Sequence, residues 1–149
     1  MSKVTKNASS ADNQQERLSA AKLKRAYLSG FIEGEGCFYV GVVPTKYHRL
    51  GWQVICEFRV SQNPKGKVIL EDLKRELGCG YIKPNHPGNP RDKTWVFMVR
   101  DKNDLREKVI PFFGRHPLRG GKCKDLEKFE NVLELIQKGK HFTNSGLLE

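Results

Sequence analysis

A nine-residue stretch at 28–36, LSGFIEGEG, constrains the fold of this chain more than any other part of it. Before it, residues 18–31 alternate apolar and basic positions at helical spacing, and after it residues 37–43 alternate as a strand does. The stretch holds three glycines, although each glycine inside a helix costs about 1 kcal/mol relative to alanine. Glu33 and Glu35 lie where the helix would end, and the helix dipole disfavours anions there. The stretch therefore predicts a helix-to-sheet junction that gains close helix contact and a placed carboxylate.

The same nine residues resemble the motif of the LAGLIDADG homing endonucleases. Four of them match that motif letter for letter: Leu28, Gly30, Ile32 and Gly36. Elsewhere Ser and Gly replace its two Ala, Phe replaces a Leu, and two Glu replace its two Asp. The resemblance extends from about residue 22 to 137, and the motif opens a domain of suitable size.

Length and composition bound the remaining possibilities. The 149 residues suit one domain with a core, predicted at 18–149, after a polar and disordered extension at 1–17. No apolar run approaches the roughly 20 residues that span a bilayer. The first residues lack the apolar segment of a secretory signal. We therefore expect an intracellular, non-secreted protein with no membrane partner and no small-molecule substrate, in the compartment that holds its target genome (the bacterial cytoplasm or an organelle).

The positive charge is unevenly distributed along the chain. The formal net charge is +10, and residues 37–100 hold eleven Lys and Arg against five acids. Residues 1–36 hold six against four, and residues 101–149 hold ten against eight. The excess of positive charge thus falls mainly on the segment that is expected to form the sheet. This favours the binding of a polyanion across one face of the sheet. A generally basic protein without a nucleic-acid partner is the alternative.

The order of expected elements is α-β-β-α-β-β-α-α. Strands are expected at 37–43, 52–61, 80–83 and 94–100, and helices from Ser19, from Asn63 to Gly78, from Asp101 or Asn103, and from Asp125 to Gly139. Along 52–61 the alternation directs Trp52 and every second residue after it to the core. This order predicts an α+β fold, in which a four-stranded antiparallel sheet carries helices on one face and binds DNA with the other.

The uncovered sheet face is the predicted contact with double-stranded DNA. It carries Tyr39, Gln53, Glu57, Arg59, Tyr81, Lys83 and Thr94. Arg can read guanine bidentately in the major groove, and Gln can read adenine. Loops add four more candidates: Lys46, Arg49, Arg119 and Lys124. An ordinary solvated face is the alternative reading of these residues.

The first helix also carries a stripe of small residues. Its members are Ala26, Ser29, Gly30 and Gly34. Such stripes let two helix backbones approach closely. Because the chain has one motif only, we expect the stripe to pack against a second copy in a twofold homodimer. Packing against another helix of the same chain is the alternative.

The resemblance implies a divalent metal site at the motif. Its metal-binding acid corresponds to Glu35, and the backbone carbonyl of Gly34 is a further ligand. Mg²⁺ is the expected ion, with Mn²⁺ or Ca²⁺ able to use the same site, since hard cations prefer oxygen ligands. Glu33 corresponds to an acid that supports the helix end. The cysteines form no CxxC pair and the histidines no HxxxH spacing, so no zinc site is expected.

Two further catalytic positions follow from the resemblance. Gln62 corresponds to a polar residue that positions water, and Lys122 to a basic residue before the last core helix, with Arg119 and Lys124 as rivals. A basic residue normally follows Gln62 after a few positions. Gly66 stands there instead, so either Lys65 or Lys67 substitutes for this residue or the role is absent.

Together these features predict an intron-encoded, site-specific homing endonuclease. It would hydrolyse both strands of a long pseudo-palindromic DNA target as a metal-dependent homodimer. The alternative is a nucleic-acid binder on the same scaffold that does not cut, such as an intron-RNA maturase or a DNA-binding regulator.

Overall fold

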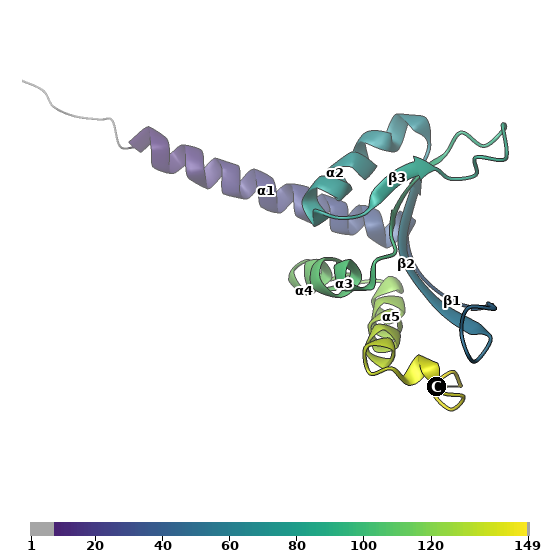
Figure 1. The fold of residues 1–149 in the computed structure, drawn as a ribbon. Coiled ribbons are helices and arrows are strands. Elements are labelled where there is room, and N and C mark those ends of the chain that lie inside the picture. Colours follow the sequence, from purple (N-terminus) through teal and green to yellow (C-terminus); the bar gives the residue numbers. More distant parts are fainter. Residues whose placement is uncertain (1–7, 149) are drawn as a thin grey trace, which may run out of the picture.

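One antiparallel sheet organises the protein, with the helices on one side of it (Figure 1). The computed structural model describes residues 8–148. The four strands lie in the order β1-β2-β4-β3, and their bounds are Gly36–Pro44 (β1), Trp52–Gln62 (β2), Tyr81–Pro84 (β3) and Trp95–Val99 (β4). The predicted α+β fold is confirmed. We call the two sides of the sheet the helix-covered face and the open face.

The helical elements connect and cover these strands. They are α1 (Ala8–Glu35), the 3₁₀ turn η1 (Pro64–Gly66), α2 (Lys67–Leu77), α3 (Lys102–Asp104), the π-helical stretch η2 (Leu105–Val109), α4 (Ile110–Arg115), α5 (Lys122–Gln137) and η3 (Lys140–Phe142). In the described part of the chain, none of these helices has the length and apolar character needed to cross a membrane.

Helix α1 is longer than the sequence pattern predicts. It begins at Ala8 rather than near Ser19, so residues 8–17 of the predicted extension are helical, while residues 1–7 lie outside the described part. The segment 8–29 contains no Gly or Pro, and Ala, Gln, Glu and Arg in it are good helix formers. The first half of α1 extends away from the sheet (Figure 1).

Local sequence signals set the bounds of α2. The Asn63 side chain accepts a hydrogen bond from the Gly66 N–H at 3.0 Å, with Pro64 at the first position of the turn. Gly78 ends the helix in the left-handed conformation, with φ of 64°. The predicted helix therefore forms, but its first three residues are a 3₁₀ turn.

An aromatic cluster holds the helices on the covered face. The Phe38 ring centroid lies 5.3 Å from that of Phe58, 5.4 Å from that of Phe113 and 5.5 Å from that of Phe129. Phe97 meets Phe58 edge to face at 6.3 Å. These rings come from β1, β2, β4, α4 and α5, so one cluster fixes three strands and two helices together.

The hairpin of β1 and β2 is longer than the layer of helices that covers it (Figure 1). Trp52, predicted to point into the core, is 47% exposed at the distal end of β2, and Val42 on β1 is also exposed. Alternation gives the side of the sheet on which a residue lies. It does not reveal how far the covering helices reach, and this is why the prediction for Trp52 is wrong.

Candidate functional site

The helix-to-strand junction at the end of α1 depends on Gly36. A Cβ atom there would lie 2.5 Å from Ile32 Cγ2 and 2.7 Å from the Ile32 carbonyl oxygen. Glycine therefore allows β1 to begin directly after Glu35. Because Gly36 pairs with Val60, the end of α1 lies beside the end of β2, where Gln62 is the last residue. The junction thus brings Glu35 and Gln62 to the same end of the sheet.

Glu33 ties a basic loop to this junction. Its carboxylate accepts a hydrogen bond from the Arg119 backbone N–H at 3.0 Å. A Cβ atom at Gly120 would lie 2.4 Å from Glu33 Oε1, so the carboxylate lies directly against this glycine. Ser29 adds a second tie, because its hydroxyl donates to the His116 carbonyl oxygen at 3.0 Å. The loop 116–121 is therefore held against α1.

The loop leads directly into α5, whose first residue is Lys122. We predicted that this helix begins at Asp125, which is wrong. The Cys123 and Lys124 N–H groups bond to the carbonyls of the two glycines before the helix, and this starts the helix earlier. Lys122 is half-buried and Lys124 exposed, both in the first turn of α5 rather than in the preceding loop.

Glu35 is exposed and makes no hydrogen bond or ion pair with any residue of the described part. It is the last residue of α1, where backbone carbonyls such as that of Gly34 have no partner within the helix. A carboxylate beside free carbonyls is an oxygen donor set, which suits a hard divalent cation. Within residues 8–148 no three His, Cys, Asp or Glu side chains converge on a metal site. A cation at Glu35 would therefore not be held by a cluster of such side chains from the described part.

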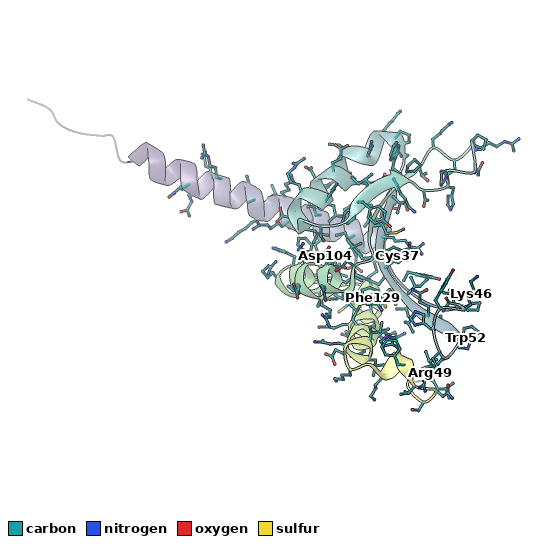
Figure 2. All side chains as sticks on the ribbon, viewed as in Figure 1. Cys37, Lys46, Arg49, Trp52, Asp104 and Phe129 are labelled. Atoms are coloured by element: carbon teal, nitrogen blue, oxygen red, sulfur yellow. The ribbon has the colours of Figure 1, made fainter. Side chains whose placement is uncertain are left out.

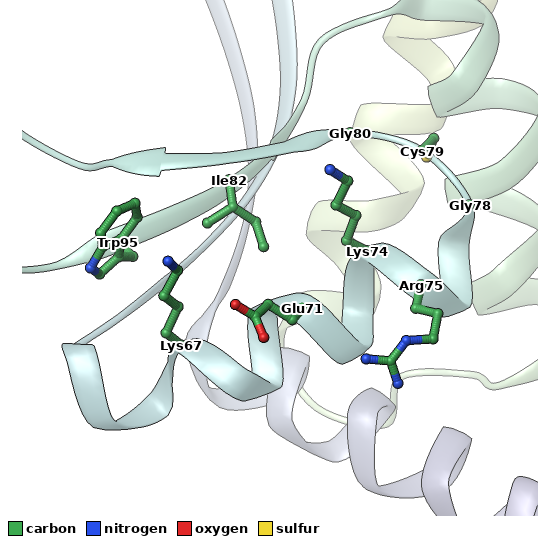
Figure 3. Close-up of a pocket in the computed structure, with 9 residues that line it drawn as sticks. All are labelled: Lys67, Glu71, Lys74, Arg75, Gly78, Cys79, Gly80, Ile82 and Trp95. Carbon is green, nitrogen blue, oxygen red and sulfur yellow. The ribbon is translucent and has the colours of Figure 1, made fainter.

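In the region after β2, the Gln62 side chain lies close to Gly66, which stands where the basic residue is expected. A Cβ atom at Gly66 would lie 2.4 Å from Gln62 Oε1, so the Gln62 side chain occupies the space above this glycine. The possible substitute Lys67 has its Nζ 3.8 Å from the centre of the Trp95 ring, in a groove of about 640 Å³ between α2 and β3 (Figure 3). Lys65 is exposed.

The open face of the sheet gathers most of the predicted DNA contacts. The strand register places Arg59 beside Cys37 on one side and Met98 on the other. Met98 lies in turn beside Tyr81, so one row of side chains crosses all four strands. Lys83 belongs to a neighbouring row. Tyr39 lies opposite Glu57, and Gln53 lies nearer the hairpin tip on the same face.

Thr94 differs from this group. It precedes β4, and its hydroxyl donates to Asp92 at 2.6 Å and accepts from the Asn85 side-chain amide at 3.2 Å. Its side chain therefore orders the loop between β3 and β4, and the predicted start of the strand at residue 94 is one residue early.

Not all of the open face is exposed to solvent. Val96 and Met98 are buried, although the strand register places them on the open face. In the strand register Met98 lies between Arg59 and Tyr81, and the Tyr81 hydroxyl is 3.1 Å from its sulfur. The long polar side chains of this face thus cover an apolar centre.

Glu57, predicted as a DNA contact, is also buried, with 4% of its surface exposed. Its carboxylate pairs with Arg100 and, at 3.5 Å, with Arg59 Nε. The hydrogen bond to Glu57 raises the pKa of the Arg100 guanidinium further above its ordinary value. Sequence analysis did not single out Arg100. The alternation along the strand contained the signal, because Arg100 lies two residues after Met98 and is therefore directed to the same face of the sheet.

The tip of the β1–β2 hairpin carries Lys46 and Arg49 beside Trp52 (Figure 2). Lys46 and Arg49 are exposed, and Arg49 borders a hollow of about 210 Å³ that the C-terminal Phe142 also lines. Arg119 lies elsewhere, in a hollow of about 390 Å³ beside the small residues of α1. The predicted loop contacts are therefore spread over separate parts of the surface.

The predicted dimer stripe divides into two parts. Ser29 is buried by its contact with the loop 116–121, as described above. Ala26, Gly30 and Gly34 are exposed, and a Cβ atom at either glycine would have no atom of the chain within 4 Å. The exposed Tyr27 adjoins these residues. Nothing in the described part of the chain therefore requires glycine at these two positions.

Comparison with known proteins agrees with this arrangement. The family model of the LAGLIDADG endonucleases matches residues 28–133. Probable intron-encoded endonuclease 2 of Neurospora crassa is 30% identical over 131 residues, covering 87% of this chain and 28% of the relative. DNA endonuclease I-CeuI of Chlamydomonas moewusii is 26% identical over 131 residues, 86% of this chain and 59% of that protein. This chain thus spans less than two thirds of the length of these relatives.

Solved structures extend the similarity to the fold. The homing endonuclease I-TnaI superposes with a TM-score of 0.76 at 36% identity, over 83% of this chain and 80% of that one. I-LtrWI, a LAGLIDADG homing endonuclease solved on its target DNA, gives 0.76 at 30% identity, over 83% of this chain and 40% of that one. The chain belongs to the LAGLIDADG endonuclease family, as the motif predicted.

Proposed function

We propose that this protein is a metal-dependent DNA endonuclease that cuts both strands of a specific double-stranded target as a homodimer. The observation that carries the proposal is Glu35, an exposed carboxylate without a partner at the junction where α1 meets the sheet. The C-terminal end of a helix disfavours a negative charge such as that of Glu35. A bound cation would offset that cost. The protein would act in the compartment that holds its target, the bacterial cytoplasm or an organelle.

In this proposal the Glu35 carboxylate and the Gly34 carbonyl hold a divalent cation, with Mg²⁺ as the physiological ion. When bound, such an ion stabilises negative charge on a phosphate and activates water for attack. Gln62, at the end of β2, orients the water that reacts. Lys122, held near the junction by the contact of Glu33 with the preceding loop, offsets charge on the phosphate. A neighbouring structure, I-SmaMI on uncleaved DNA, was solved in the presence of calcium ions.

The homodimer is supported by the exposed glycines of α1. Each of Gly30 and Gly34 costs about 1 kcal/mol of helix stability relative to alanine, yet neither is needed for packing within the described chain. Close approach of a second α1 would give both glycines a role. Twofold pairing at this stripe would place one Glu35 from each copy near the axis, one for each DNA strand.

DNA binding is assigned to the open face and its borders. The net charge of +10 and the excess of base over acid in residues 37–100 supply attraction to phosphate. Arg, Lys, Gln and Tyr side chains on β1, β2 and β3 supply hydrogen-bonding groups. I-LtrWI, which is similar in fold, was solved bound to its target DNA.

A cleavage assay tests the catalytic assignment. Target sites are first selected as cleavable sequences from a randomised duplex pool in magnesium, and one is placed in a supercoiled plasmid. We expect the wild type to produce linear DNA, and Glu35→Gln to bind the site without cutting it. The matched control Glu130→Gln removes an exposed carboxylate of α5 and should cut normally. Cleavage by Glu35→Gln at the wild-type rate would discard the metal assignment.

Sedimentation tests the homodimer. Gly30→Leu should give a monomer at micromolar concentration, because the side chain blocks the approach of a second helix. Gly114→Leu is the control, since its glycine lies in α4 with equally open space around it. A wild type that stays monomeric with and without its DNA would contradict the homodimer.

A non-cutting nucleic-acid binder, such as a maturase or a DNA-binding regulator, is the second candidate. Gly66 is the observation that favours it, because Gln62 fills the place of the basic residue that the family motif leads us to expect. In that case selection by binding would recover specific sequences, and magnesium or manganese would not lead to their cleavage.

A further inference from the structure

Two arginines on the open face share one buried carboxylate. The Glu57 side chain is 5% exposed, whereas the side chains of Arg59 and Arg100 are 36% and 53% exposed. Glu57 Oε1 accepts a hydrogen bond from Arg100 Nε and forms an ion pair with Arg100 Nη2, and Oε2 lies 3.5 Å from Arg59 Nε. Both carboxylate oxygens are therefore paired. One pairs with Arg59 of β2, and the other pairs with Arg100, the residue that follows β4.

Arg59 is also held from its other side. Its guanidinium carbon lies 4.6 Å from the centre of the Tyr39 ring, a distance typical of a cation–π contact. The Tyr39 ring lies over Gly41, where a Cβ atom would be 2.4 Å from the phenol oxygen. Glycine at this strand position therefore makes room for the ring that supports Arg59.

The contacts leave part of each guanidinium free, but Arg100 uses more of its donors than Arg59 does, because its Nε and Nη2 pair with Glu57 and its guanidinium also interacts with Tyr81. Arginine has five N–H donors, and the Nε of both arginines is directed to Glu57. On Arg59 both amino groups remain, and on Arg100 the donors that Glu57 and Tyr81 do not use remain. The fork of guanidinium N–H groups matches the O6 and N7 acceptors of guanine. A side chain that only anchors phosphate needs no fixed orientation, whereas base readout gains from one, because less side-chain freedom is lost on binding.

We propose that Arg59 and Arg100 form one guanine-reading unit, and that Glu57 is its positioning residue rather than a base contact. Arg100 is thereby a specificity-determining residue that the sequence pattern did not reveal. This inference rests on the proposed function, because it requires DNA on the open face. It is independent of the metal site and of cleavage.

Equilibrium binding to a randomised duplex pool, with intact bound duplexes sequenced, tests the unit. The full-length wild type should prefer guanine at one or two positions of each half-site. Glu57→Gln and Arg100→Lys should both relax the preference about tenfold at those same positions, and leave the preference elsewhere unchanged. Asp72→Asn is the matched control, since Asp72 bridges Lys24 and Arg75 at 2.9 and 2.8 Å. It should change no preference.

The outcomes separate this inference from the proposed function. If the wild type selects a sequence and Arg100→Lys selects it with equal discrimination, the reading unit is wrong while DNA binding stands. If Arg100→Ala weakens all sequences equally and reduces the salt slope by about one, Arg100 anchors phosphate and the inference is overturned. A wild type that selects nothing overturns both. Arg100→Lys keeps the test decisive if Glu57→Gln does not fold, because Arg100 is half-exposed.

Discussion

The two faces of the sheet are ordered by different forces. On the helix-covered face, Phe58 and Phe97 are fully buried, and packed rings hold the helices in place. On the open face, Glu57 is almost as well buried, yet it is held by two arginines, one of which packs on the ring of Tyr39. The covered face uses shape and apolar area, which give stability. The open face uses directed hydrogen bonds, which give orientation.

The comparison teaches that burial alone does not identify the role of a strand residue. Val60 and Glu57 lie three residues apart on β2 and are both buried, but the side chains that surround them differ in kind. Substitutions on the covered face should therefore change the free energy of unfolding and leave base preference intact. Substitutions of the exposed polar side chains on the open face should do the reverse.

The largest expected effect is that of Phe58→Ala. Removing this ring leaves a cavity among Phe38, Phe97 and Phe113, at a cost of about 3–5 kcal/mol in unfolding free energy. Urea denaturation measures it. Val42→Ala is the control on the same face, because Val42 is exposed beyond the helices, and it should cost under about 1 kcal/mol. Equal losses from both would show that the two parts of this face are packed alike.

A pair of glycine substitutions compares the faces at the level of one methyl group. At Gly36 a Cβ would meet the Ile32 carbonyl at 2.7 Å, and a backbone atom cannot move aside, so Gly36→Ala should cost about 1–3 kcal/mol. At Gly41 the atom in the way is the end of the Tyr39 side chain. Gly41→Ala should cost under about 1 kcal/mol and weaken base preference instead. Chemical denaturation and the binding selection measure the two effects, and a reversed order would break the comparison.

The smallest expected effect is a pH dependence at the border of the open face. Hydrogen bonds from Thr94, and then from His86, lower the pKa of Asp92 from 3.8 to about 2. The charged form is thus favoured in the folded state, and its contribution is present above pH 3.8 and lost as pH falls through 2. Melting curves should show the wild type above Asp92→Asn at pH 5, with the difference disappearing near pH 2. A constant difference across this range would contradict the lowered pKa.

Local signals in the sequence were sufficient for much of the fold. Alternation located β1 and β2 within one or two residues, and Asn63, Pro64 and Gly78 predicted the bounds of the segment that holds α2. These features depend on contacts between near neighbours in the chain. The length of α1 was missed because its polar first half has no apolar stripe, and a helix without one gives no periodic signal.

The candidate site was less accessible to sequence reasoning, because it depends on contacts between distant segments. The pairing of Arg100 with Glu57 follows from the register of β2 against β4, which are joined through α2 and β3. The early start of α5 follows from the loop that Glu33 holds. Neither contact has a signature within a short window. Family resemblance supplied Glu35, Gln62 and Lys122, whose roles remain predictions.

Under the proposed readout of bases by Arg59 and Arg100, the shared carboxylate also limits how this protein can acquire a new target. An exchange of Arg59 alone would leave Glu57 half-paired and buried, and an exchange of Arg100 alone would do the same. Neighbours in one ionic network couple by about 0.5–3 kcal/mol, so their substitutions do not add. A new base preference at this position, whether it arises in evolution or in the laboratory, therefore requires simultaneous substitutions at residues 57, 59 and 100. Libraries that vary one of these codons at a time would miss the functional combinations.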